Sequence, residues 1–191
     1  MIYETIITSI DEQGLPHIAP FGIREHEDLV VIAPFRPSAT LDNLLDSRSA
    51  VVNYTDDVRI FAGALTGRNQ WPLSPAKHIK GHVLDVALAH RELELVGIKE
   101  DIQRPELSFK VVHEEAHAPF KGFNRAQAAV IELAILVSRL HMLPLEKVEA
   151  EITYLQIAIH KTAGERELQA WSWLMERIEN HKAQIAGDNL A

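Results

Sequence analysis

The sequence predicts an α+β protein, mainly β, in which a barrel or sheet is followed by helices. Short runs of β-branched and aromatic residues, separated by turn residues, fill the chain up to about residue 120. Beyond that point, apolar residues recur at helical spacing. No low-complexity tract or flexible linker separates the two parts. We therefore expect a β domain over residues 1–121 and a C-terminal helical subdomain over residues 122–191, packed on the β domain.

The first part predicts a series of strands joined by short turns. Their expected bounds are residues 3–10, 16–25, 29–35, 50–56, 79–95 and 107–117. The turns DEQG and HED make the first three strands antiparallel neighbours in a meander. Pro16, Pro20 and Pro34 cannot donate to a strand ladder, so we expect them at strand starts, edges or bulges.

Helices are expected where apolar residues share one face. Their expected bounds are residues 38–48, 125–141, 144–163 and 165–183. Residues 60–75 are interpreted as a short helix followed by a loop rich in Gly and Pro. Ser38 is a favourable N-cap for the first helix. Gly164 suits the C′ position after the helix over residues 144–163. Trp171, Leu174 and Ile178 form an apolar stripe on the last helix, which indicates that its core-facing side lies there.

The composition is that of an ordinary soluble domain, with 47% hydrophobic and 24% charged residues. The net charge of −8 argues against a broad nucleic-acid surface. Because the chain has no cysteine, disulfides, thiolate catalysis and cysteine-based metal sites are excluded. The most apolar stretch, residues 126–140, is too short to cross a bilayer, and the N-terminus lacks a signal-peptide pattern. We expect a cytoplasmic protein without a membrane or nucleic-acid partner.

The segment HEEAH, residues 113–117, matches a zinc-protease motif that requires a helix. The preceding LSFKVV alternates like a strand, and Pro119 follows too closely for a long helix. We therefore interpret the segment as a strand end with solvated side chains and expect no metal site. Metal binding through His113 and His117 stays as a remote alternative.

The segment PFRPSATLDNL, residues 34–44, combines a cation with hydroxyl groups at a helix start. Arg36 offers a planar fork that matches phosphate oxygens. Ser38 and Thr40 add hydroxyls, and the helix start adds unpaired N–H groups at the positive end of the helix dipole. The segment predicts a phosphate cradle. A capped helix beside a surface arginine is the alternative.

Two strand segments have features that suit a flat ligand. In HIAPFGI, residues 17–23, Pro20 and Gly22 interrupt the ladder and can expose the backbone to such a ligand. In NYTDD, residues 53–55 place polar groups at a strand end, where they can meet the edge of a heteroaromatic ring. A bulged edge strand and a solvated strand end are the respective alternatives.

A second helix start that suits an anion lies in KGFNRAQ. Lys121 and Arg125 flank Asn124, which is a good N-cap, and Gly122 allows a ligand to approach the backbone closely. A charged hinge between the β part and the helices is the alternative interpretation.

Taken together, HIAPFGI, YTDD and GFNRAQAAVIELAI resemble the FMN-binding split β-barrel superfamily, and within it the DUF447 family of FMN-binding proteins. The resemblance covers nearly the whole chain, including the helices. It implies a homodimer in which two barrels pack side by side and FMN lies near the interface. It also implies three groups of FMN-binding residues. These are Arg36, Ser38, Ala39 and Thr40 at the phosphate, His17, Ala19, Pro20, Phe21, Gly22, Asn53, Tyr54 and Thr55 along the ring, and Asn124 and Arg125 from the helical part.

The function expected from this resemblance is that of a flavin-dependent oxidoreductase or reductase with an unknown substrate. The chain lacks a nucleophile elbow and the Walker and Rossmann glycine signatures, so a bound cofactor would carry any chemistry. No catalytic residue is assigned. The alternative is a non-enzymatic protein that stores, delivers or senses FMN.

Overall fold

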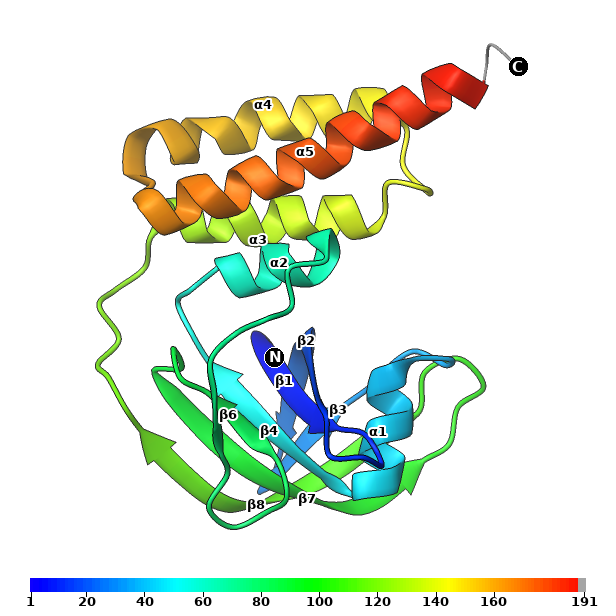
Figure 1. Ribbon diagram of the computed structural model, residues 1–191, viewed down its shortest axis with the longest axis vertical. Helices are drawn as coiled ribbons and strands as arrows, with labels where there is room; N and C mark the ends of the chain where they lie inside the picture. Colours follow the sequence, from blue (N-terminus) through cyan, green and yellow to red (C-terminus); the bar gives the residue numbers. More distant parts are fainter. Residues whose placement is uncertain (189–191) are drawn as a thin grey trace. The chain divides into compact units, whose positions relative to one another are not determined.

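Six antiparallel strands close into a barrel in the order β1-β2-β3-β8-β7-β4 (Figure 1). The computed structural model describes residues 1–188. The barrel strands are β1 (Ile2–Ile10), β2 (Pro16–His26), β3 (Leu29–Ile32), β4 (Ser49–Tyr54), β7 (Ala89–Lys99) and β8 (Glu106–Ala116). A separate two-stranded sheet pairs β5 (Leu73–Pro75) with β6 (His82–Leu84). This architecture confirms the predicted α+β class and the barrel in the first part of the chain.

The barrel interior is apolar because each strand sends alternate side chains inward. The core contains Ile7, Ile23, Val30, Ile32, Leu41, Leu44, Ala50, Val52, Leu93, Leu95, Leu107 and Phe109. Phe109 is fully buried, and Leu41 and Leu44 come from helix α1 (Ala39–Ser47). Helix α1 therefore contributes its apolar face to the barrel core.

The predicted meander is confirmed, since β2 pairs antiparallel with both β1 and β3. Residues 16–24 of β2 pair with β1, whereas pairing with β3 begins at Arg24. Pro20 therefore lies where β2 has a neighbour on one side, and Pro16 is the first residue of the strand, as expected for a residue without an N–H. Strand β3 ends at Ile32, so Pro34 follows the strand.

A β-bulge changes the direction of the side chains of β8. Leu93 of β7 pairs with Val111, and Glu92 pairs with His113, so Val112 is an extra residue. Before the bulge, Phe109 faces the barrel core. After it, His113 and the residues that alternate with it face outward, on the same side as Glu92.

The helical unit has its own hydrophobic core. It contains α3 (Arg125–Ser138), α4 (Leu145–Thr162), α5 (Glu165–Asp188) and the short helix α2 (Arg59–Thr66), which Figure 1 shows beside α3 and α5. The predicted stripe of Trp171, Leu174 and Ile178 is buried in this core. Val58 and Ala62, from the α2 segment, are buried in the same core. No helix within residues 1–188 is long and apolar enough to cross a membrane.

The structural units differ from the sequence boundary in one segment. One unit contains residues 1–56 and 70–120, and the other contains residues 57–69 together with the chain from Lys121 onward. The sequence placed residues 57–69 in the β part because of their position along the chain, but their apolar face joins the helical core. Packing of the helical subdomain on the barrel stays a prediction.

Two local expectations are corrected. The expected strand over residues 79–95 is instead the three-residue β6, a connection and β7, because the chain turns between Leu84 and Ala89. Gly164 follows α4 without a left-handed conformation, and its N–H donates to Glu167 Oε2 at 2.9 Å. Gly164 thus helps to start α5.

Replacing Phe109 with alanine should lower the free energy of unfolding by about 3–5 kcal/mol, since it removes a fully buried ring from the barrel core. Phe35→Ala is the matched control because Phe35 is 63% exposed, and it should cost about 1 kcal/mol or less. Urea denaturation of both variants measures the difference. Equal costs would contradict the assigned core.

Candidate functional site

The predicted phosphate cradle lies at the start of α1. Ser38 adopts an extended conformation, and its Oγ accepts a hydrogen bond from the N–H of Leu41 at 3.2 Å, which confirms the predicted N-cap. Thr40 is buried and Ala39 is exposed. The Ser38 hydroxyl can still donate its proton to an anion at this positive helix end.

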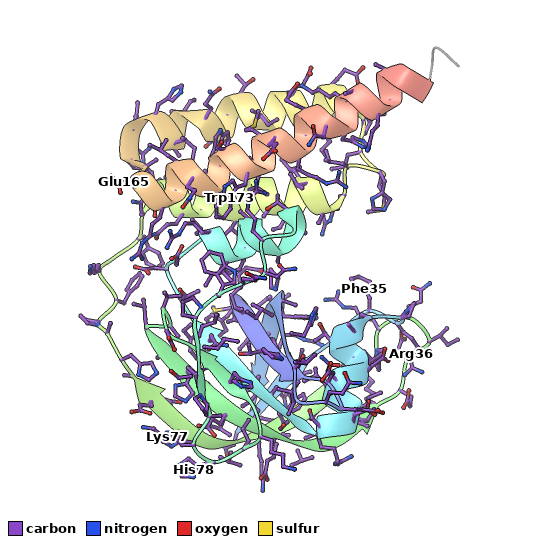
Figure 2. The ribbon with its side chains drawn as sticks, viewed as in Figure 1. Phe35, Arg36, Lys77, His78, Glu165 and Trp173 are labelled. Atoms are coloured by element: carbon purple, nitrogen blue, oxygen red, sulfur yellow. The ribbon has the colours of Figure 1, made fainter. Side chains whose placement is uncertain are left out.

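Arg36 precedes this helix start and is engaged in the barrel unit. Its N–H donates to the carbonyl of Gln103 at 2.8 Å, and its Nη2 lies 3.2 Å from Glu100 Oε2. The side chain is 45% exposed, so its ion pair is a weak surface pair that a phosphate can displace. Figure 2 shows Phe35 and Arg36 together in this loop, well apart from Lys77 and His78.

The predicted ring-lining residues of β2 divide between two faces. Ile23 and Phe21 pack in the barrel core, so the face shared by His17, Ala19 and Phe21 is directed inward. His17 is half-buried, and burial lowers the pKa of its imidazole below the usual value. At Gly22, a Cβ would lie 2.7 Å from Cγ2 of the exposed Ile2, so part of the space above this glycine is already occupied.

Asn53 is fully buried, and its amide is used inside the protein. Its Nδ2 donates to Thr8 Oγ1 at 2.6 Å and to the Ile6 carbonyl at 3.2 Å, and its Oδ1 accepts from the N–H of Leu84 at 2.9 Å. Asn53 and Pro20 both pair with Ile6, so they lie two strands apart, roughly 10 Å.

Tyr54 and Thr55 follow Asn53 at the end of β4. Tyr54 is half-buried against the barrel core, where burial raises the pKa of its hydroxyl. The Thr55 hydroxyl donates to the carbonyl of Val86 at 3.3 Å. The structure therefore brings the β2 and β4 segments close to each other, but it uses several of their polar groups for internal bonds.

The last two predicted residues belong to the helical unit. Asn124 caps α3, since its Oδ1 accepts from the N–H of Ala126 at 2.8 Å and its Nδ2 donates to the Thr162 carbonyl at 3.0 Å. Arg125 is exposed on the first turn of α3. Gly122, just before them, has a φ of 108°, a conformation that favours glycine.

A second polar site lies on the outer face of β7 and β8. The sequence singled out His113 and His117 there but missed the contribution of His90 and Glu92. Here a cavity of about 280 Å³ is lined by polar groups that include His90, Glu115 and His117. His90 Nδ1 lies 2.8 Å from His117 Nε2, and the two rings are stacked. Burial lowers the pKa of His90, an effect that a hydrogen bond to the carboxylate of Glu92 partly offsets.

Glu92 holds the loop that covers this outer face. It is fully buried, and its carboxylate accepts backbone N–H bonds from Lys77 at 2.7 Å, His78 at 2.7 Å and Ile79 at 3.0 Å. Burial by itself raises the pKa of Glu92, but these three bonds and the one with His90 outweigh it, so the pKa is below the usual value. Glu92 is therefore ionised and structural.

The segment HEEAH is a strand, as the sequence predicted. His113 lies in β8, and His117 follows directly after it. Both residues nevertheless border the same group of side chains, because alternate residues of a strand share a face. The alternating polar residues His90, Glu92 and Glu94 were the signal in the sequence for this outer face.

Comparison with protein families assigns both parts of the chain. The family model described as the N-terminal domain of a protein of unknown function (DUF447) matches residues 3–118. The C-terminal model, described as a protein of unknown function (DUF447), matches residues 124–176. The two matches together cover the barrel, α3, α4 and about half of α5.

Solved structures share the fold. An FMN-bound DUF447 protein from Methanosarcina mazei has a TM-score of 0.78 and 21% identity, covering 92% of this chain and 94% of the other. A 2-nitrobenzoate 2-nitroreductase from Pseudomonas fluorescens has a TM-score of 0.53 and 22% identity, covering 60% and 64%. The flavin reductase component of a bacterial two-component tryptophan halogenase has a TM-score of 0.52 and 16% identity, covering 62% and 82%. The chain therefore has the split-barrel fold of these proteins.

Replacing Glu92 with glutamine should lower the free energy of unfolding by about 2–3 kcal/mol, because the amide group turns a donor toward buried N–H groups. Hydrogen exchange at the amides of residues 77–79 should become faster. Glu94→Gln is the control on the same strand. Its ion pair with Lys110 is about half exposed, so its loss should cost about 1 kcal/mol or less. Unchanged exchange in Glu92→Gln would contradict the assigned role.

The lowered pKa of His17 makes stability depend on pH. Between its folded-state pKa and 6.5, the unfolded chain binds more protons than the folded one, so the free energy of unfolding rises with pH. His17→Gln should flatten this rise just below pH 6.5. NMR titration of the imidazole together with urea denaturation at several pH values checks both expectations. A His17 pKa above 6.5 would show that burial does not control this residue.

Proposed function

The chain belongs to the DUF447 family, and from this premise we propose that it is an FMN-binding flavoprotein with flavin-dependent oxidoreductase activity. The observation that carries the proposal is the structural match over 92% of the chain to a family member solved with FMN bound. The similar folds of a nitroreductase and of a flavin reductase component support the redox part of the proposal.

The donor set at the start of α1 suits the FMN phosphate. A phosphate dianion there meets the Arg36 guanidinium, the Ser38 hydroxyl and the positive end of a nine-residue helix. The Thr40 hydroxyl is buried at the first turn and can complete the set. This binding replaces the exposed ion pair between Arg36 and Glu100 with a charge-assisted bond to the cofactor.

The β2 and β4 segments are proposed to line the flavin ring. Because Asn53 is fully satisfied within the barrel, its part is to hold the strand in place, and backbone groups around Pro20 and Thr55 are the better contacts. Arg125 is exposed and free of the capping role that Asn124 performs, so it is the better ligand of the two.

A homodimer would complete the site. Phe35, beside Arg36, is 63% exposed, and a partner barrel seated there would cover its ring. Bound FMN would supply the electron transfer, while the protein would position the cofactor and its substrate. The purified protein should sediment as a dimer, and a monomer at working concentration would overturn this part of the proposal.

The visible spectrum of the purified protein, with the released flavin identified, is the direct test. FMN at about one per chain, together with oxidation of NADH or NADPH by the loaded protein, supports the proposal. Tight FMN binding without turnover by any nicotinamide or artificial donor would favour storage, delivery or sensing. A colourless protein that does not take up added FMN would overturn the proposal.

Arg36→Ala should weaken FMN binding by about 1–3 kcal/mol, or roughly 5- to 150-fold, because it removes a charge-assisted phosphate contact. Arg24→Ala is the matched control. The Arg24 side chain is 44% exposed and forms an ion pair with Glu106. The Arg36 side chain is 45% exposed and forms an ion pair with Glu100. Flavin fluorescence titration measures both affinities. The phosphate cradle is wrong if the two variants bind FMN equally well.

A further inference from the structure

A cluster of histidine and carboxylate side chains lies where the bulge in β8 turns residues outward. One ligand atom each from His90, His113 and Glu115 lies within 4.8 Å of the others. His90 is buried, whereas the side chains of His113 and Glu115 are 24% and 34% exposed. We propose that these three residues bind a divalent transition-metal ion of the zinc class, at a site separate from the proposed FMN phosphate site.

The donor set favours zinc over the hard cations. Two imidazole nitrogens and one carboxylate oxygen are typical ligands for Zn²⁺, whereas Mg²⁺ and Ca²⁺ select oxygen ligands. Tetrahedral coordination at about 2.0–2.1 Å places ligand atoms roughly 3.4 Å apart. Separations of up to 4.8 Å therefore require a contraction of at most about 1.4 Å, which side-chain rotation on two adjacent strands can supply.

The surroundings orient the buried histidine as metal sites require. Ligand histidines usually hold their second nitrogen against a carboxylate or another acceptor, which fixes the ring. Both nitrogens of His90 have partners, since Nε2 lies 3.5 Å from Glu92 Oε1 and Nδ1 lies 2.8 Å from His117 Nε2. One nitrogen would exchange its partner for the metal ion, and the partner of the other nitrogen would keep the ring in place. Glu92 is itself held by three backbone N–H groups, so it is a rigid positioning residue.

The Lys77 ammonium group lies beside Glu115, where the proposed metal ion would bind. Its Nζ lies 2.6 and 2.8 Å from the two carboxylate oxygens. The side chain is 58% exposed, and Figure 2 shows it beside His78 on the loop over the strands. The ammonium can therefore move into solvent when a metal ion replaces it, and the two cations compete for Glu115.

The site is accessible and has room for a further ligand. His90 and Glu115 line the cavity of about 280 Å³ on this face. Three protein ligands with an open position are typical of zinc sites that exchange or activate a bound molecule, whereas structural zinc sites have four protein ligands. A water molecule or a small anion in the cavity would complete the tetrahedron.

The site does not depend on the proposed FMN phosphate site. Arg36 pairs with Glu100, which directly follows the end of β7, whereas His90 lies near the start of this strand. Ten residues of strand can span at most roughly 33 Å, and they place His90 and Glu100 at opposite ends of β7 within one chain. Failure of zinc binding would thus leave the FMN proposal untouched, and failure of FMN binding would leave the zinc proposal untouched.

Zinc titration of the full-length, chelator-treated protein, with a competing zinc indicator, tests the proposal. The expected result is one Zn²⁺ per chain, with His113→Gln and Glu115→Gln each weakening the affinity by at least about tenfold. Lys77→Gln should strengthen it, because the competing ammonium is lost. X-ray absorption of the zinc-loaded protein should show two imidazoles among nitrogen and oxygen ligands.

His26→Gln is the matched control, since His26 is an exposed histidine at the end of β2. It should leave zinc affinity unchanged, and circular dichroism checks that each variant is folded. The proposal is overturned if the wild type binds less than one Zn²⁺ per chain. It is equally overturned if His113→Gln binds zinc as tightly as His26→Gln does, or if Lys77→Gln weakens binding.

Discussion

Strands in a closed barrel send alternate side chains into the core and out to the opposite face, and the rest of the barrel unit depends on this constraint. Leu93 and Leu95 of β7 fill the core, while His90 and Glu92, which precede them, face outward. In β8 the same alternation would keep odd-numbered residues inside. The extra Val112 shifts the alternation, so Phe109 lies in the core and His113 lies outside.

The outward face of β7 has a buried charge that the covering loop must satisfy. Glu92 is fully buried, and an unpaired carboxylate there would be strongly unfavourable. Three backbone N–H groups from residues 77–79 donate hydrogen bonds to this carboxylate and stabilise its charge. The same bonds fix the loop over the strands. The same arrangement creates the cavity beside His90 and Glu115.

The barrel thus has two chemically distinct regions, which suit different ligands. The start of α1 offers a guanidinium, hydroxyls and a helix N-terminus, a set that suits an anion. The outer face of β7 and β8 offers imidazoles and carboxylates, a set that suits a cation.

The sequence by itself determined most of the elements and several of their caps. The predicted meander, Ser38 and Asn124 as N-caps, and the buried stripe of α5 follow from turn residues, capping chemistry and helical spacing, which act over a few residues. Arg36 and Ser38 were predicted as one phosphate site for the same reason, since they are neighbours in the chain. Only the tertiary structure decided that the α2 segment packs in the helical core. It also decided that the Asn53 side chain forms hydrogen bonds inside the barrel and that His90 lies close to His113. These outcomes depend on strand pairing, on a one-residue bulge and on which apolar faces meet, and such contacts join residues far apart in the chain.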